Sequence, residues 1–168
     1  YKSVPAMYHR WPAQDDLYAL FRCSARLYRR NLSAAIDLHH PQPLSDRRKR
    51  GTKRARNAGL EILRGTKHLG RFWPVLTDVL QARHAARPVH SLQEIQLLAQ
   101  WFPEQIDFVG AQHGTELVAG VVLFLTERVC HAQYIAACEP GTEFGALDLV
   151  FESVIADCQS CGREWFDF

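Results

Sequence analysis

The chain has 168 residues, of which 47% are hydrophobic and 23% are charged, and its formal net charge is +2. This composition is typical of a globular protein with one core or two smaller ones, and it excludes disordered and fibrous classes. The longest apolar run, residues 117–125, is far shorter than the roughly 20 residues of a membrane-spanning helix. Five scattered cysteines and the lack of a signal-peptide pattern favour a reduced, cytoplasmic protein.

Basic residues are concentrated in one segment. Residues 47–56, RRKRGTKRAR, contain seven of the 20 Lys and Arg residues and no acidic residue, which leaves 13 basic against 18 acidic residues elsewhere. This run predicts one strongly positive face. The candidates for binding phosphate or nucleic acid are Arg47, Arg48, Arg50, Lys53 and Arg54. A solvated connecting helix is the alternative, and the run has no aromatic residue on which a base could stack.

The first part of the chain predicts two helices and two short strands. Apolar spacing predicts an amphipathic helix over residues 15–28, and residues 32–38 are typical of a strand. Ser45 is placed to begin a helix through the basic run, and Gly59 is placed to end it. A short strand follows directly, over residues 59–63.

Two further helices are expected before the main group of strands. Pro74 suits the first turn of a helix that runs to Ala86, with Arg83 on its inner side. Ser91 and Glu94 have the spacing of a capping box, which predicts that the next helix begins at this point.

The remaining residues predict strands around one long helix. Residues 105–138 contain three strands, and the continuous apolar run in the middle one indicates a central, buried strand. Residues 139–146, EPGTEFGA, are expected to form a glycine-containing loop before a helix over 147–161 and a last strand over 164–168. This order indicates an α/β (α+β) fold with a mixed, partly antiparallel sheet flanked by helices.

Several segments resemble the GNAT acyltransferase superfamily. RRKRGTKRARNAGLEI, LVAGVVLF, HAQYIAA, GALDLVFESVI and WFDF are similar to the bacterial branch in which two GNAT-like units are fused. That branch includes Fem-type peptidoglycan-bridge aminoacyltransferases and GNAT proteins linked to cell-surface polysaccharide synthesis. The resemblance implies that residues 1–58 are the end of a first GNAT-like half plus a basic connecting helix, and that residues 59–168 are a second GNAT-like domain without its last helix and strands. The chain would then be an excerpt of a longer protein.

The resemblance implies an acyltransferase that moves an acyl group from acetyl-CoA or another acyl-CoA to an amine. The acceptor would be a small molecule or a glycan-linked amine in cell-surface polysaccharide or peptidoglycan metabolism, and no metal is implied. Two alternatives stay open. One is a Fem-type transferase that uses aminoacyl-tRNA and binds it through the basic run, and the other is a non-catalytic binding module with the GNAT fold.

In GNAT folds, the loop after the fourth strand and the following helix N-terminus hold the pyrophosphate of CoA. The residues at those positions here are Gly141, Thr142, Gly145 and Ala146. The segment departs from the family's Gly-x-Gly/Ala signature, and Glu139 and Glu143 add negative charge. The alternative is that the glycines only shape a turn.

Polar residues on the strand 129–137 are the candidates for catalysis, because polar groups on a buried strand are costly unless they are paired or used. Strict alternation places His131 and Gln133 on one face and Tyr134 on the other. His131 is the expected base that takes a proton from the amine, and Tyr134 is the expected acid that returns one to the leaving group. A histidine paired with a backbone carbonyl is the alternative.

Two other polar residues are candidates for binding substrate, namely His90 and Asp148. His90 also suits a surface loop, and Asp148 suits the first turn of a helix, where it would face the helix dipole favourably. Cys158 and Cys161 lie on an apolar helical stripe and are expected to pack in the core, because a zinc site would need four ligands.

Overall fold

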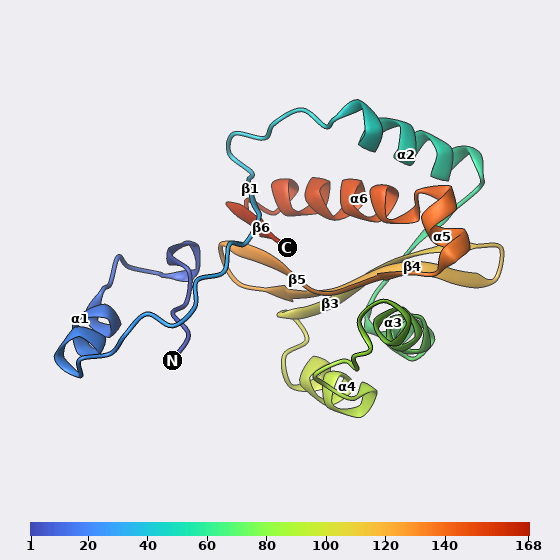
Figure 1. The fold of residues 1–168 in the computed structure, drawn as a ribbon. Helices are drawn as coiled ribbons and strands as arrows, with labels where there is room; N and C mark the ends of the chain where they lie inside the picture. The colour runs from blue at the N-terminus through green and yellow to red at the C-terminus, as the bar shows by residue number, and fades with distance from the viewer.

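The computed structural model describes residues 1–168 and contains one six-stranded sheet with helices on both faces (Figure 1). The strands are β1 (Ala35–Asp37), β2 (Glu61–Arg64), β3 (Ile106–His113), β4 (Glu116–Leu125), β5 (Val129–Ala137) and β6 (Trp165–Asp167), in the spatial order β1-β6-β5-β4-β3-β2. β5 and β6 pair in parallel, and all other neighbours are antiparallel. The mixed, partly antiparallel α/β class expected from the sequence is confirmed.

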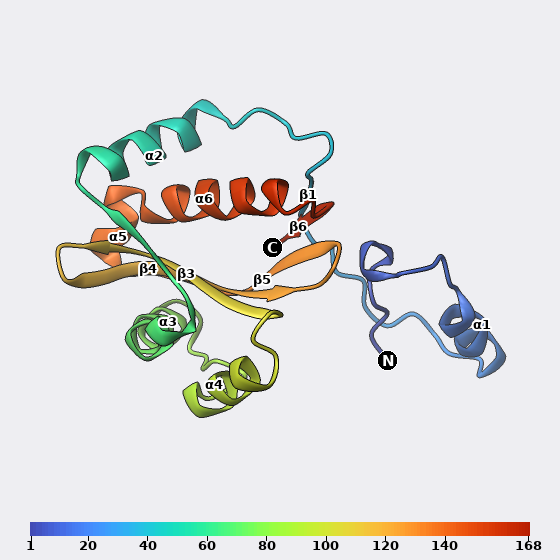
Figure 2. The ribbon, with the colours of Figure 1, turned by 180° about the vertical axis from the view of Figure 1, so that it is seen from behind.

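The helices form layers on the two faces of this sheet (Figures 1 and 2). They are α1 (Asp15–Arg22), α2 (Asp46–Asn57), α3 (Leu69–His84), α4 (Leu92–Trp101), α5 (Glu139–Phe144) and α6 (Ala146–Ser160), with single 3-10 turns η1 (Ala6–Tyr8) and η2 (Thr66–His68). α5 and α6 cover one face and α2 lies outside α6, whereas α3 and α4 cover the other face. Each face has its own buried apolar cluster, and β4 contributes to both, as its continuous apolar run predicts.

The capping box of α4 is present as predicted. The Ser91 hydroxyl accepts the backbone N–H of Glu94 at 3.2 Å, and the Glu94 carboxylate accepts the backbone N–H of Ser91 at 2.6 Å. The hydrogen bonds from Ser91 lower the pKa of Glu94 because they stabilise its charged form. Glu94 therefore has a structural role at this helix end.

α3 begins earlier than its proline suggests. It starts at Leu69, after η2, so that Pro74 is its sixth residue rather than part of the first turn. Phe72 and Trp73 are buried against the sheet, and their packing stabilises the added turn although proline supplies no backbone N–H. Arg83 is exposed, so its predicted place on the inner side of the helix is wrong.

The N-terminal elements are shorter than predicted. α1 ends at Arg22 instead of residue 28, and β1 covers only residues 35–37 of the expected 32–38. The apolar side chains of α1 are exposed, with Phe21 76% accessible, so no packed face extends this helix. β1 is limited to its antiparallel pairing with β6, and α1 lies to one side of the sheet (Figure 1).

α2 begins after Ser45, as predicted, and ends at Asn57, with Ala58 as its C-cap before Gly59, which has a positive φ. Its small residues Gly51, Thr52 and Ala55 are buried on the side that faces α6. β1 and α2, which the sequence assigned to a preceding unit, thus both pack on residues after 58. The division of the chain at residue 58 stays a prediction.

The expected loop over residues 139–146 is mostly helical. Residues 139–144 form α5, and Gly145 connects it to α6 with φ +76°. Gly141 lies so close to β4 that a Cβ atom on it would stand 2.2 Å from the carbonyl oxygen of Val118. The absence of a side chain at Gly141 therefore permits α5 to pack on β4.

We expect Gly141→Ala to lower the free energy of unfolding by about 1–3 kcal/mol, because the methyl group would push α5 away from the backbone of β4. Gly70→Ala is the matched control, because Gly70 is also helical but its Cβ position has no neighbour within 4 Å. The control should keep or raise stability by up to about 1 kcal/mol. Urea unfolding measures both, and equal stability of the two variants would contradict the prediction.

Candidate functional site

An irregularity in β5 decides which polar side chains share a face of the sheet. The pairing of β4 with β5 skips Gln133, because Val122 lies opposite Tyr134 and Leu123 lies opposite Ala132. This extra residue is a β-bulge, and it reverses the alternation of side chains beyond it. The predicted placement of His131 and Tyr134 on opposite faces is therefore wrong.

Both side chains lie on the face covered by α3 and α4. Tyr134 belongs to the apolar cluster on this face, and His131 is the register partner of Phe124, which packs against the same cluster. Cys130 and Ala132 belong to the cluster under α6. Two of the three residues predicted for catalysis thus share a face, and the third, Gln133, is the bulged residue between them.

His131 is held by a buried carboxylate from the neighbouring strand. Its Nδ1 atom lies 3.1 Å from Oδ2 of Asp167, its register partner on β6, and the Tyr8 hydroxyl donates to the same oxygen at 2.5 Å. Asp167 is only 5% exposed, and its other oxygen, Oδ1, is buried without a hydrogen-bond partner. The His131 side chain remains 29% exposed, so a ligand can approach its ring.

Tyr8, which hydrogen-bonds to Asp167, belongs to the N-terminal turn η1. Next to it, the carbonyl oxygen of His9 accepts a hydrogen bond from Nη1 of Arg128 at 2.7 Å, and Arg128 also forms a two-pronged ion pair with Glu164. Burial and the hydrogen bond to Asp167 raise the pKa of Tyr8 well above its ordinary value. The Tyr8 hydroxyl therefore keeps its hydrogen at neutral pH and donates it to the Asp167 carboxylate.

Tyr134 is hydrogen-bonded to His90, a residue predicted to bind substrate. Its hydroxyl oxygen accepts the backbone N–H of His90 at 3.1 Å and lies 2.7 Å from the His90 Nδ1 atom. Because the oxygen already accepts the backbone N–H, its own hydrogen can be donated to the His90 ring. The edge of Tyr134 also meets Trp73, with ring centroids 5.4 Å apart. The structure thus brings together His90 and Tyr134, which are 44 residues apart in the sequence.

Three of the four residues expected to hold a donor pyrophosphate are buried. Gly145 and Ala146 are buried, and a Cβ atom on Gly145 would stand 2.7 Å from the carbonyl oxygen of Gly51 in α2. Gly141 packs on β4, and Thr142 is the only one of the four that is exposed, with its hydroxyl donating to the carbonyl of Cys138. α2 therefore lies directly against Gly145. The role of these four residues in binding a donor stays a prediction.

The basic residues of α2 divide into two sets. Arg48 forms an ion pair with Asp148 at 2.5 Å, and Arg56 pairs with Glu152, so these two arginines bind α2 to α6. The exposed candidates without an ion pair are Arg47, Arg50, Lys53 and Arg54. Their spacing places them on the side of α2 that faces away from the buried residues. Asp148, predicted to bind substrate, is thus engaged by Arg48.

The two cysteines of the α6 stripe have different environments. Cys158 is buried beside Cys130, as core packing predicts, and the hydrogen bond with Cys158 together with burial raises the pKa of Cys130. Cys161 is exposed because α6 ends at Ser160, so its predicted core position is wrong. No three His, Cys, Asp or Glu side chains gather as a metal site would require.

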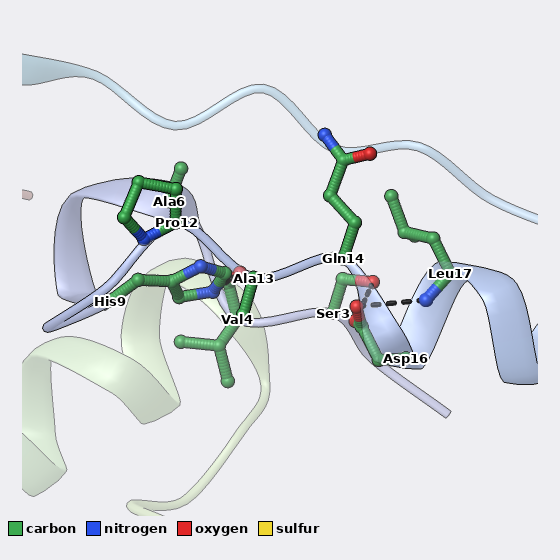
Figure 3. A pocket seen from close by; sticks show the side chains of 9 residues that line it. All are labelled: Ser3, Val4, Ala6, His9, Pro12, Ala13, Gln14, Asp16 and Leu17. Atoms are coloured by element: carbon green, nitrogen blue, oxygen red, sulfur yellow. Dashed lines mark hydrogen bonds between the residues drawn. The ribbon is translucent and has the colours of Figure 1, made fainter.

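A shallow hollow of about 280 Å³ lies elsewhere, in the N-terminal segment (Figure 3). All nine residues that line it come from positions 3–17, and none is a predicted site residue. The figure shows Asp16 bonded to Ser3 and to the backbone of Leu17 at one end, and His9 and Gln14 among apolar side chains elsewhere. Because it lacks convergent reactive groups, we place the candidate site at β5 instead.

Sequence reasoning missed two members of the site, Tyr8 and Asp167. Asp167 carried a usable signal, because an acidic residue between two phenylalanines in a strand has to be paired when it is buried. Tyr8 carried none, since its role depends on how a segment 159 residues away in the sequence folds back.

The GNAT acetyltransferase domain family matches residues 44–168, and the chain therefore belongs to this family. Solved structures share its fold at low identity. FemX has a TM-score of 0.66 at 8% identity over 81% of this chain and 52% of its own, and L-PGS from Bacillus licheniformis has 0.67 at 10% over 92% and 49%. An aminoglycoside acetyltransferase from an uncultured soil metagenomic sample has 0.51 at 14% over 62% and 73%.

The chain spans about half the length of the first two of these structures. No curated protein sequence matches it. None of its helices combines the length and the apolar character that crossing a membrane requires.

The ion pair between Arg48 and Asp148 predicts thermodynamic coupling between α2 and α6. We expect Asp148→Ala to lower the free energy of unfolding by about 1–2 kcal/mol, and to cost about 1 kcal/mol less when Arg48 is already alanine. A double-mutant cycle followed by urea unfolding measures this coupling. Lys49→Ala in place of Arg48→Ala is the control, because Lys49 faces Asp46 instead. Additive effects of the Arg48 and Asp148 substitutions would contradict the pairing.

Proposed function

We propose that this GNAT domain is an acyltransferase that transfers an acyl group from an activated donor to an amine. The observation that carries the proposal is the partly exposed His131, held by buried Asp167 on the same sheet face as Tyr134 and His90. A histidine with an acidic partner is suited to take a proton from an attacking amine. GNAT domains typically use acyl-CoA, which supports this reaction class.

In the proposed mechanism, the amine nitrogen attacks the acyl carbonyl while His131 takes its proton, and Tyr134 or His90 returns a proton to the leaving group. The pairing of β5 with β6 ends at His131 and Asp167, although β5 continues to Ala137. Main-chain N–H groups on that edge of β5 are available to polarise the carbonyl. Positioning and polarisation supply most of the rate in this scheme, with proton transfer adding a smaller factor.

Two donor classes remain, because the segment 139–146 departs from the family's phosphate-binding signature and carries Glu139 and Glu143. Acyl-CoA is the donor typical of the fold, and aminoacyl-tRNA is the donor of the Fem-type enzymes that the sequence resembles. The acceptor would be a small or glycan-linked amine in cell-surface polysaccharide or peptidoglycan metabolism. We place the reaction in the cytoplasm, where both donors are made.

We expect the protein to transfer radiolabelled acetyl from acetyl-CoA to a member of a panel of primary amines that includes amino sugars. His131→Gln should reduce the rate about 100-fold, because the base is lost. His84→Gln is the control, since His84 is exposed at the end of α3. Following the label avoids thiol reagents, which would react with exposed Cys23 and Cys161. Full activity of His131→Gln would refute the assignment of the base.

The second candidate, aminoacyl transfer from tRNA, is favoured by the exposed basic face of α2. If tRNA binds there, Arg47→Glu/Arg50→Glu/Arg54→Glu should abolish binding of bulk aminoacyl-tRNA. Milder Arg→Ala changes at the same positions should lower the slope of log Kobs against log salt by about 2–3. Filter binding at several salt concentrations measures both effects.

The matched control is Arg26→Glu/Arg83→Glu/Arg87→Glu, which changes the net charge equally at exposed positions outside α2. Equal losses in both triple variants would mean that net charge alone governs binding. If neither acetyl-CoA nor aminoacyl-tRNA binds at millimolar and micromolar concentrations, respectively, the third reading gains support, namely a binding module that keeps the fold without the reaction.

A further inference from the structure

We propose that Asp167 and Tyr8 are positioning residues that fix the His131 ring with its hydrogen on Nδ1, so that Nε2 presents the lone pair to the substrate. The inference rests on the proposed function, since it gives His131 the role of the base. The sequence placed all candidate catalytic residues on β5. The inference adds two residues from distant parts of the chain, one of them in the N-terminal turn.

The hydrogen-bond donors around the carboxylate set the tautomer. An ionised carboxylate only accepts hydrogen bonds, so Nδ1 at 3.1 Å from Oδ2 must carry a hydrogen. The Tyr8 hydroxyl occupies the same oxygen at 2.5 Å, which fixes the orientation of the Asp167 side chain. With Nδ1 protonated, the neutral ring has its lone pair on Nε2, on the opposite side of the ring from Asp167.

The surroundings of Asp167 also favour the charged ring that forms during the reaction. Both donors lie on Oδ2, and the buried Oδ1 has no partner, so the negative charge is incompletely stabilised. A positive charge on the adjacent His131 compensates for it when Nε2 takes the amine proton. The new N–C bond forms and the bond to the leaving group breaks as Tyr134 or His90 gives it a proton. The proton on Nε2 then passes to water, and water returns one to that acid.

The position of Tyr8 makes the N-terminal turn part of the site. η1 is held against the β5–β6 end of the sheet by the hydrogen bond from Arg128 to the His9 carbonyl. The Tyr8 and His131 rings meet edge to face, with centroids 6.5 Å apart. The turn therefore contacts both members of the pair that it positions.

The tautomer can be read directly from long-range 15N NMR correlations of the histidine rings, without any substrate. We expect His131 in the wild-type chain at alkaline pH to be a single Nδ1–H species, with its signal assigned by its loss in His131→Gln among the eight histidines. Asp167→Asn should shift the ring toward Nε2–H, because the asparagine amide can donate to Nδ1. Tyr8→Phe should keep Nδ1–H, since the carboxylate remains.

Acyl transfer supplies the second readout. Asp167→Asn should lower kcat at least about 100-fold with KM nearly unchanged, and Tyr8→Phe should lower it about tenfold. Tyr18→Phe, at an exposed tyrosine of α1, is the control and should match the wild type. An Nε2–H or mixed wild-type ring would overturn the inference while leaving acyl transfer itself in place. Unchanged kcat in an Asp167→Asn variant with a flipped ring would overturn it as well.

If Asp167→Asn fails to fold, the wild-type spectrum and the folded Tyr8→Phe variant still decide the matter. A wild-type Nδ1–H ring with a tenfold loss in Tyr8→Phe supports the inference, and full activity of Tyr8→Phe refutes the role of Tyr8. A protein with the expected tautomer that transfers no acyl group to any amine, from either donor, refutes the proposed function and with it the role of His131 as a base.

Discussion

The arrangement of the candidate site depends on one extra residue in β5. Without the bulge at Gln133, regular alternation would place His131 and Tyr134 on opposite faces of a buried strand, beneath different helices. With it, both face α3 and α4, and Tyr134 meets His90 while His131 meets Asp167. Bulges of this kind re-aim side chains at functional sites, and here the bulge converts scattered polar residues into one polar region.

A second constraint acts at the other end of β5, where α2 packs on α6. A Cβ atom on Gly145 would meet the Gly51 backbone, and one on Gly51 would meet the Asp148 side chain, which forms an ion pair with Arg48. This contact stabilises the fold and joins α2 to the start of α6. The basic side chains of α2 that form no ion pair are exposed on the outer side of the helix.

The site also combines parts that lie far apart in the chain. β6 and the N-terminal turn meet at the edge of β5, and each contributes one group, Asp167 and Tyr8, to the histidine. A buried carboxylate lowers the free energy of unfolding unless it is paired. The polar group of Tyr8, His131 and Asp167 is therefore less favourable for stability than apolar packing would be. Such local exceptions are expected at functional sites rather than in the core.

The sequence by itself determined the order of the elements apart from α5, the buried central strand, the capping box at Ser91 and the family, because apolar periodicity and helix-end chemistry are local. The sequence also indicated His90, His131 and Tyr134 as candidate site residues, because polar residues on or beside a buried strand are unusual. Only the tertiary structure decided how they are grouped, because a bulge shifts alternation through strand pairing and not through residue type. The partners of His131 and the contact at Gly145 likewise depend on residues 36 or more positions apart in the sequence, which local patterns do not record.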